Sequence, residues 1–154
     1  MDDETAGGPP ETAIYMCARA STYRRLAQQL PRPDDVVVEV GAADGKATRR
    51  LAQAARRVIA LEKAPAVVEK ARAALRRLDN VTLLQADARQ LKPVLDLVER
   101  ADVVFIDISG GAPPAQTLEF GETYRTRLRP RILVLRNTKL NAFAESVTYV
   151  EPTT

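Results

Sequence analysis

Residues 36–45, with the sequence VVVEVGAADG, decide the fold of this chain. Four of the first five are valine, which is typical of a strand buried on both faces of a parallel sheet. A turn of small residues follows, in which Gly41 and Gly45 permit a tight backbone. Over residues 46–58 the apolar positions fall on one helical face. The stretch predicts a strand, a glycine turn and a helix, with a polar ligand at the carboxyl end of the strand.

Strand and helix patterns alternate along the rest of the chain. Further strands are predicted at residues 57–62, 81–85, 102–106 and 132–135, and helices at 65–78, 91–98, 115–128 and 138–144. Residues 13–30 read as one helix ahead of the first strand, and residues 146–150 as a last strand. Five alternations of strand and helix predict an α/β fold, a Rossmann-like three-layer sandwich whose mostly parallel sheet carries helices on both faces.

Length and composition fit one domain in a reducing compartment. We expect a flexible arm at residues 1–12 and a single domain at residues 13–154, of which residues 36–135 form the core. The one cysteine, Cys17, allows no internal disulfide and fits a cytoplasmic location. No apolar run reaches the roughly 20 residues that cross a membrane. Because the chain contains no histidine, zinc sites built on imidazole and His-activated nucleophiles are excluded, and we expect no metal site.

The net charge of +3 does not by itself indicate a nucleic-acid partner. Arginine pairs such as Arg24-Arg25 and Arg49-Arg50 lie on predicted helices, where we interpret them as solvated faces. The run at residues 125–131 differs, because it gathers four arginines just before the fifth predicted strand. We expect these residues to form a basic patch that meets phosphates; they are Arg125, Arg127, Arg129 and Arg131.

Four acids stand at or just past the carboxyl ends of four predicted strands. Taken singly, each one is better explained as a solvated loop residue or a helix N-cap than as part of a ligand site. In a parallel sheet, however, these strand ends share one edge, where ligands bind near the point at which the strand order reverses. We therefore expect one polar rim around a ligand site, formed by Glu39, Glu62, Asp87 and Asp107.

On these motifs the chain resembles the class I S-adenosylmethionine-dependent methyltransferases. Residues 39–45, EVGAADG, match the first family motif, an acid followed by three alternate glycines, with Ala43 in the second glycine place. Glu62 stands 21 residues after Gly41, where the family has the acid that holds the ribose hydroxyls. Asp87 resembles the acid that faces the adenine amino group, and Asp107 the acid near the methyl group.

The resemblance implies S-adenosylmethionine as cofactor and S-adenosylhomocysteine as product. It implies that the glycine turn and helix start bind the cofactor carboxylate, and that Glu39 or Asp107 binds its ammonium. Methyl transfer is an in-line displacement, for which Asp107 is the best-placed proton acceptor, with Ser109 and Lys139 as weaker candidates. The expected cofactor-binding residues are Glu39, Gly41, Ala42, Ala43, Asp44, Gly45, Glu62, Lys63, Asp87, Ala88, Asp107 and Ile108.

Two alternatives stay open. A nicotinamide-dinucleotide oxidoreductase would share the fold, but its G-x-G-x-x-G fingerprint is not matched, and Asp44 would repel a pyrophosphate. A scaffold of the same fold, which binds the cofactor without catalysis or binds nothing, would have no need of acids at all four strand ends.

The region after the fifth predicted strand is short for this family, whose core ends in an antiparallel pair of strands. Only residues 136–154 follow that strand, so the chain resembles a compact member with a shortened C-terminus and an incomplete sheet edge. Such an edge favours pairing with another copy, and we expect a possible homodimer there. The methyl acceptor is unknown. Because little of the chain is left over to form a lid, we favour a macromolecular acceptor, RNA or protein.

Overall fold

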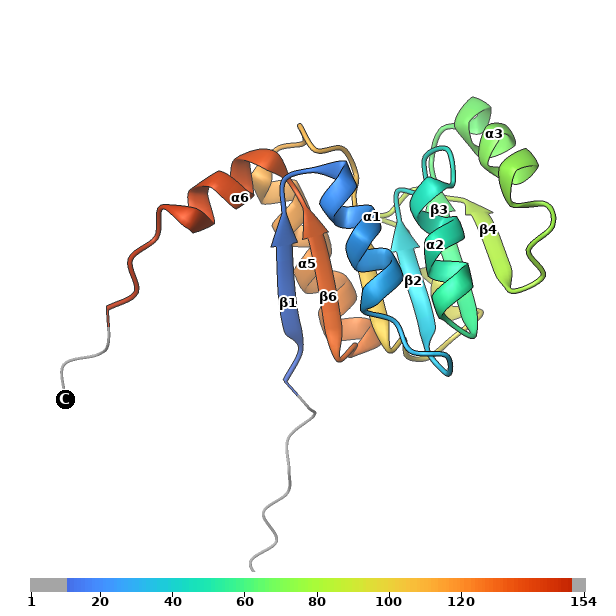
Figure 1. The fold of residues 1–154 in the computed structure, drawn as a ribbon, viewed down its shortest axis with the longest axis horizontal. Helices are drawn as coiled ribbons and strands as arrows, with labels where there is room; N and C mark the ends of the chain where they lie inside the picture. Colours follow the sequence, from blue (N-terminus) through green and yellow to red (C-terminus); the bar gives the residue numbers. More distant parts are fainter. Residues whose placement is uncertain (1–10, 151–154) are drawn as a thin grey trace, which may run out of the picture.

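Six strands form one sheet in which every pairing is parallel, and the computed structural model describes it within residues 11–150 (Figure 1). The strands lie in the order β1-β6-β5-β2-β3-β4. From β2 the chain winds outward to β3 and β4, then returns to β5 beside β2 and winds the other way, so the order reverses between β2 and β5. The strands are β1 Ala13–Cys17, β2 Val36–Val40, β3 Arg57–Glu62, β4 Val81–Gln85, β5 Val103–Ile106 and β6 Ile132–Arg136.

Helices cover both faces of this sheet because alternate strand residues point to opposite sides. One face packs Val37, Val58 and Phe105 against α1 and α2, and the other packs Val38, Ile59 and Ile106 against α4 and α5. In Figure 1, α1 and α2 lie side by side in front of the strands and α5 lies behind them. The helices are α1 Ala20–Gln29, α2 Lys46–Ala54, α3 Pro65–Leu75, α4 Lys92–Leu95, α5 Pro114–Leu128 and α6 Thr138–Glu145.

The predicted fold class is confirmed, including the three layers and the five core strands. The sheet is parallel throughout, where the sequence predicted a mostly parallel one. Among the described residues no helix is long and apolar enough to cross a membrane.

The helix predicted for residues 13–30 is wrong in its first part. Residues Ala13–Cys17 form strand β1, and only Ala20–Gln29 are helical. Strand β1 pairs with β6 from Ala13 opposite Ile132 to Cys17 opposite Arg136. All five of its residues, AIYMC, are apolar, but such a short run fits a helix as well as a strand. Its burial rises from exposed at Ala13 to buried at Cys17, so it lacks the full burial of a core strand.

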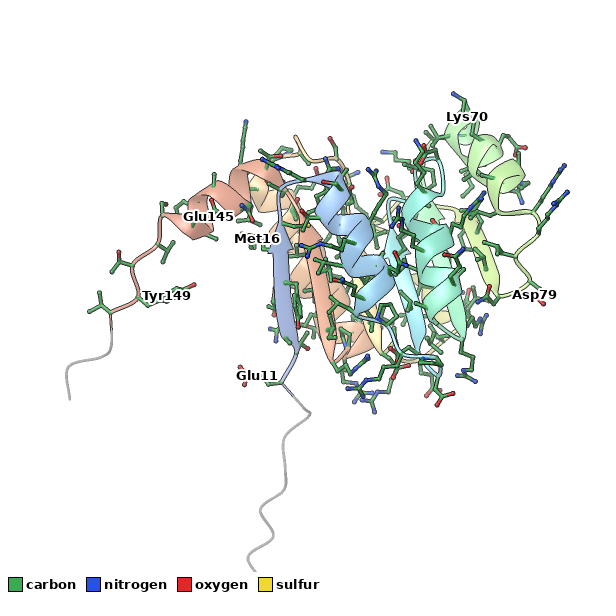
Figure 2. All side chains as sticks on the ribbon, viewed as in Figure 1. Glu11, Met16, Lys70, Asp79, Glu145 and Tyr149 are labelled. Atoms are coloured by element: carbon green, nitrogen blue, oxygen red, sulfur yellow. The ribbon has the colours of Figure 1, made fainter. Side chains whose placement is uncertain are left out.

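The strand predicted for residues 146–150 is also wrong. These residues form no strand, and the place beside β6 that a further strand would take is occupied by β1. The sheet edge predicted to be incomplete is therefore extended from the amino-terminal side. The segment runs away from the sheet instead, and Tyr149 within it is 89% exposed (Figure 2).

Most of the flexible arm predicted for residues 1–12 lies outside the described residues. Thr12 falls inside them and is held in place, since its hydroxyl donates to the Pro130 carbonyl at 2.7 Å.

Candidate functional site

The glycine turn after β2 takes a left-handed backbone at three positions. Gly41 has φ +90°, Ala43 φ +47° and Gly45 φ +81°. At Gly41 a side chain is also excluded, because a Cβ there would lie 1.9 Å from the backbone oxygen of Asp107. Gly41 thus lets the turn after β2 touch the end of β5, at the point where the strand order reverses.

Five backbone N–H groups of this turn already have acceptors within the protein. The Gly41 and Ala42 N–H groups donate to the Leu61 carbonyl, and the Gly45 N–H donates to the Ala42 carbonyl. The Ala43 N–H donates to the Glu62 carboxylate, and the Lys46 N–H donates to the Asp44 carboxylate. The turn is therefore held in a fixed shape. These five amides are not free for an anionic ligand, and binding of the cofactor carboxylate by the helix start stays a prediction.

Glu62 ties the end of β3 to the glycine turn. Its Oε2 accepts from the Ala43 N–H at 2.9 Å, and its Oε1 accepts from the N–H groups of Lys63 and Ala64 at 2.9 and 3.0 Å. A carboxylate has about four lone-pair positions, so this one has capacity left for a further donor. Glu62 also lines the pocket described next.

A pocket of about 490 Å³ opens over the carboxyl ends of the strands. Its volume lies within the range of small-molecule sites. Apolar side chains of Leu61, Val67 and Phe120 form part of its wall. Eight of the twelve expected cofactor-binding residues line it, namely Gly41, Ala43, Glu62, Lys63, Asp87, Ala88, Asp107 and Ile108.

Asp87 lies in this pocket between two cations. Its Oδ2 is 3.2 Å from the Lys63 ammonium and 3.4 Å from the Arg89 guanidinium. The Arg89 backbone N–H, followed by the Lys63 ammonium, holds the pKa of Asp87 below its usual value. Asp87 is therefore charged at neutral pH.

Asp107 also has a cationic partner. The Arg136 guanidinium donates from Nη1 to Oδ2 of Asp107 at 2.7 Å, and the Ser109 N–H donates to Oδ1 at 3.2 Å. Arg136 and Asp107 are 21% and 17% exposed, and both line the pocket.

Sequence reasoning missed Arg136. It ends the fifth core strand, the same kind of position that the four acids occupy, but it is basic and the predicted rim consisted of acids alone. Arg89, Gln116 and Phe120 line the pocket and were missed as well.

Glu39 does not line the pocket. It is fully buried on the face of the sheet that carries α1 and α2, where its Oε2 accepts from the Thr48 hydroxyl and its Oε1 has no partner. Burial raises the pKa of its carboxyl to about 8. Ala42, Asp44 and Gly45 lie outside the pocket too, so the structure does not bring these four residues to the ligand space.

Asn137 fixes the loops around the pocket. It is fully buried, its Oδ1 accepts from the Leu140 N–H at the start of α6, and its Nδ2 donates to the Ala112 carbonyl and to Thr117 Oγ1. The next residue, Thr138, donates its N–H to the Gly110 carbonyl. The loop after β5, which carries Asp107 and Ser109, is thus anchored to the start of α6. Lys139 in α6 is exposed and does not line the pocket.

The basic patch predicted at residues 125–131 is not a patch beside the site. Arg131 precedes the first residue of β6 and therefore lies at the amino edge of the sheet, opposite the pocket. Two of the four arginines are also neutralised, because Arg125 pairs with Glu122 at 2.7 Å and Arg131 with Asp35 at 2.8 Å.

The parallel sheet with a polar pocket at its switch point defines a nucleotide-cofactor-binding α/β protein. A family model described as a methyltransferase domain matches residues 37–130, more than half of the chain. The chain belongs to this family, the class I S-adenosylmethionine-dependent methyltransferases.

Solved structures share the fold. Fibrillarin from Aeropyrum pernix, in complex with natively bound S-adenosyl-L-methionine, has 24% identity over 73% of this chain and 54% of its own, with TM-score 0.58. Precorrin 8w decarboxylase from Methanobacterium thermoautotrophicum has 29% identity over 82% of this chain and 69% of its own, with TM-score 0.61. An rRNA methylase from Streptococcus thermophilus has 17% identity over 82% of this chain and 78% of its own, with TM-score 0.60. This chain therefore spans about half the length of the fibrillarin chain. A comparison with curated proteins gave no significant match.

Proposed function

We propose that this protein is an S-adenosylmethionine-dependent methyltransferase that transfers the methyl group to an acceptor by in-line displacement. The observation that carries the proposal is Glu62. Its carboxylate already accepts three backbone N–H bonds and retains accepting capacity, and the residue lines the pocket. Two adjacent ribose hydroxyls are donors that suit this capacity. The residues present therefore fit the cofactor that the family uses.

The adenine end of the cofactor fits the other side of the same pocket. Val67 and Ala86 offer apolar surface for the base, and Asp87 offers a carboxylate for its amino group. Tyr124 supports this side, since its hydroxyl donates to the Ala88 carbonyl at 3.0 Å and holds the loop after β4.

The amino acid end of the cofactor fits the Asp107–Arg136 pair. This end carries an ammonium and a carboxylate, and the pair offers one group of each opposite charge within the pocket. Five of the amides that the sequence assigned to the carboxylate are already used. We therefore assign the cofactor carboxylate to Arg136 and its ammonium to Asp107.

The bound cofactor would supply an electrophilic methyl group, so the protein chiefly has to hold the acceptor atom in line. The anchored loop after β5 sets the position of Asp107 and Ser109. If the acceptor must lose a proton, Asp107 remains the candidate to receive it.

Calorimetric titration with S-adenosylmethionine, S-adenosylhomocysteine and NADH tests the proposal. We expect binding of the first two ligands and none of NADH. Glu62→Gln keeps the size of the side chain but removes the charge, and it should weaken binding about tenfold or more. Glu69→Gln is the matched control, because Glu69 is 72% exposed on α3. Binding of NADH alone would support the oxidoreductase, and no binding at all would support the scaffold.

The proposal extends to the methyl acceptor, the oligomeric state and the cellular location of the protein. The acceptor is a macromolecule, as the lack of a dedicated lid within residues 11–150 suggests. A second copy could pair with the outer edge of β1, where Ile14 is 54% exposed, and sedimentation of the purified protein measures this. A cytoplasmic location fits Cys17, whose thiol is buried.

A further inference from the structure

A second hollow, of about 770 Å³, lies between α1 and α2. The two helices lie side by side on one face of the sheet (Figure 1). Helix α1 contributes Arg24 and Gln28, which are four residues apart, and α2 contributes side chains at helical spacing from Lys46 to Gln53. We call this hollow the α1–α2 groove; it is lined by Arg24, Gln28, Asp44, Gly45, Lys46, Arg49, Arg50, Gln53 and Ala74.

The groove concentrates positive charge. Its lining contains four basic side chains and one acidic side chain, which gives a net charge of +3. This local net charge is as large as that of the whole chain. Among residues 11–150, Lys46 alone of these four cations has a carboxylate partner, Asp44 at 2.8 Å. Arg49 and Arg50 donate to neutral oxygens, the Ala74 carbonyl and the Gln28 amide, which hold the two guanidinium groups at the groove. The arginine pair interpreted from sequence as a solvated face thus contributes to an anion-attracting surface.

The groove adjoins the cofactor pocket. Ala43 lines the pocket and the next residue, Asp44, lines the groove, so the glycine turn is the wall between them. An extended anion that lies along α1 and α2 therefore runs beside the wall of the cofactor pocket.

The lining favours a phosphodiester backbone over an acidic peptide. Guanidinium groups match phosphate oxygens in a bidentate geometry, and glutamine amides such as those of Gln28 and Gln53 commonly contact phosphate and sugar. The groove offers no aromatic or large aliphatic side chain, so a peptide would find no apolar anchor and a base no stacking platform. We propose that the α1–α2 groove binds the phosphodiester backbone of a nucleic acid, independently of its sequence, and that this nucleic acid is the methyl acceptor. The inference rests on the proposed methyltransferase function.

Fluorescence anisotropy with short labelled single-stranded RNA, single-stranded DNA and polyglutamate tests the inference across a salt series. The test variant is Arg24→Gln/Arg49→Gln, which removes one cation from each wall. The matched control is Arg127→Gln/Arg129→Gln, which removes the same charge from two exposed arginines near the opposite edge of the sheet. Thermal unfolding and S-adenosylhomocysteine titration of each variant establish that the fold and the pocket are intact.

We expect the wild type and the control to bind nucleic acid equally. The groove variant should bind about tenfold more weakly or worse at about 50 mM salt, and its log–log salt slope should fall by about 1.4, or 0.7 for each lost phosphate contact. Equal losses in both double variants would overturn the inference, as would equal affinity for polyglutamate. If the wild type binds S-adenosylhomocysteine but no nucleic acid, the nucleic-acid-binding role of the groove is refuted and the proposed function is not. If the wild type binds no cofactor, the proposed function is refuted. A preference between RNA and DNA identifies the nucleic acid and supports the inference.

Discussion

The Arg136 guanidinium, at the end of β6, lies 2.7 Å from the Asp107 carboxylate, just past the end of β5. The two side chains come from neighbouring parallel strands and meet at the wall of the pocket. A zwitterionic ligand carries an ammonium and a carboxylate. It can therefore separate this ion pair and still give each of the two partly buried side chains a group of opposite charge.

Arg136→Ala should therefore weaken binding of S-adenosylhomocysteine about 10- to 100-fold, as expected for a lost charge-assisted hydrogen bond. Binding of 5′-methylthioadenosine, which lacks the amino acid end, should change by less than about twofold. Isothermal titration calorimetry measures both. Arg72→Ala, on the exposed surface of α3, is the matched control. An equal loss for both ligands would show that Arg136 acts only on the fold, for example through its bond to the Ala18 carbonyl.

Gly41→Ala should unfold the turn or the whole protein. The new Cβ would lie 1.9 Å from the Asp107 backbone oxygen at a φ of +90°, so strands β2 and β5 would have to separate. We expect a loss of about 3 kcal/mol or more in the free energy of unfolding, measured by urea denaturation. Gly111→Ala is the control, because the nearest atom to its Cβ is 3.9 Å away. Similar stabilities of the two variants would contradict the close approach.

The buried Glu39 should make stability fall as pH rises. Its carboxyl loses a proton near pH 4.5 in the unfolded chain but only near pH 8 in the folded protein. Between these values the folded state holds more protons, so raising the pH favours unfolding, by up to about 1.4 kcal/mol per pH unit from this group. Urea denaturation from pH 5 to pH 8 measures the slope. Glu39→Gln should flatten it, whereas the exposed Glu69→Gln should not.

Asn137→Ala should destabilise the protein by about 2–4 kcal/mol, because it removes a helix cap and leaves the Ala112 carbonyl and the Thr117 hydroxyl without their buried partner. The comparison is Asn141→Ala in the same helix, whose side chain bonds to exposed Glu145 and whose loss should cost about 0.5 kcal/mol or less. Chemical denaturation checks both. A smaller effect at residue 137 than at residue 141 would rule out its anchoring role.

Much of the site was predictable because its signals are local. Glu62 and Asp87 could be located because each follows a strand whose apolar pattern is clear, and parallel strand ends share one edge. The direction of a side chain was not predictable in the same way. Glu39 comes from the same motif, yet it points into the layer beneath α1 and α2, which only the pleat of β2 and the packing of Thr48 decide.

The sequence by itself determined the strand, turn and helix at residues 36–54 and the five-strand core, because valine-rich runs, glycine and helical spacing act over a few residues. The tertiary structure alone decided what completes the sheet, since the short apolar run of β1 fits a helix as well as a strand and its pairing with β6 decides between them. It also decided which charges meet. Arg136 reaches Asp107, and Arg24 and Arg49 share a groove, because packing brings strand ends and helix faces together across long sequence separations.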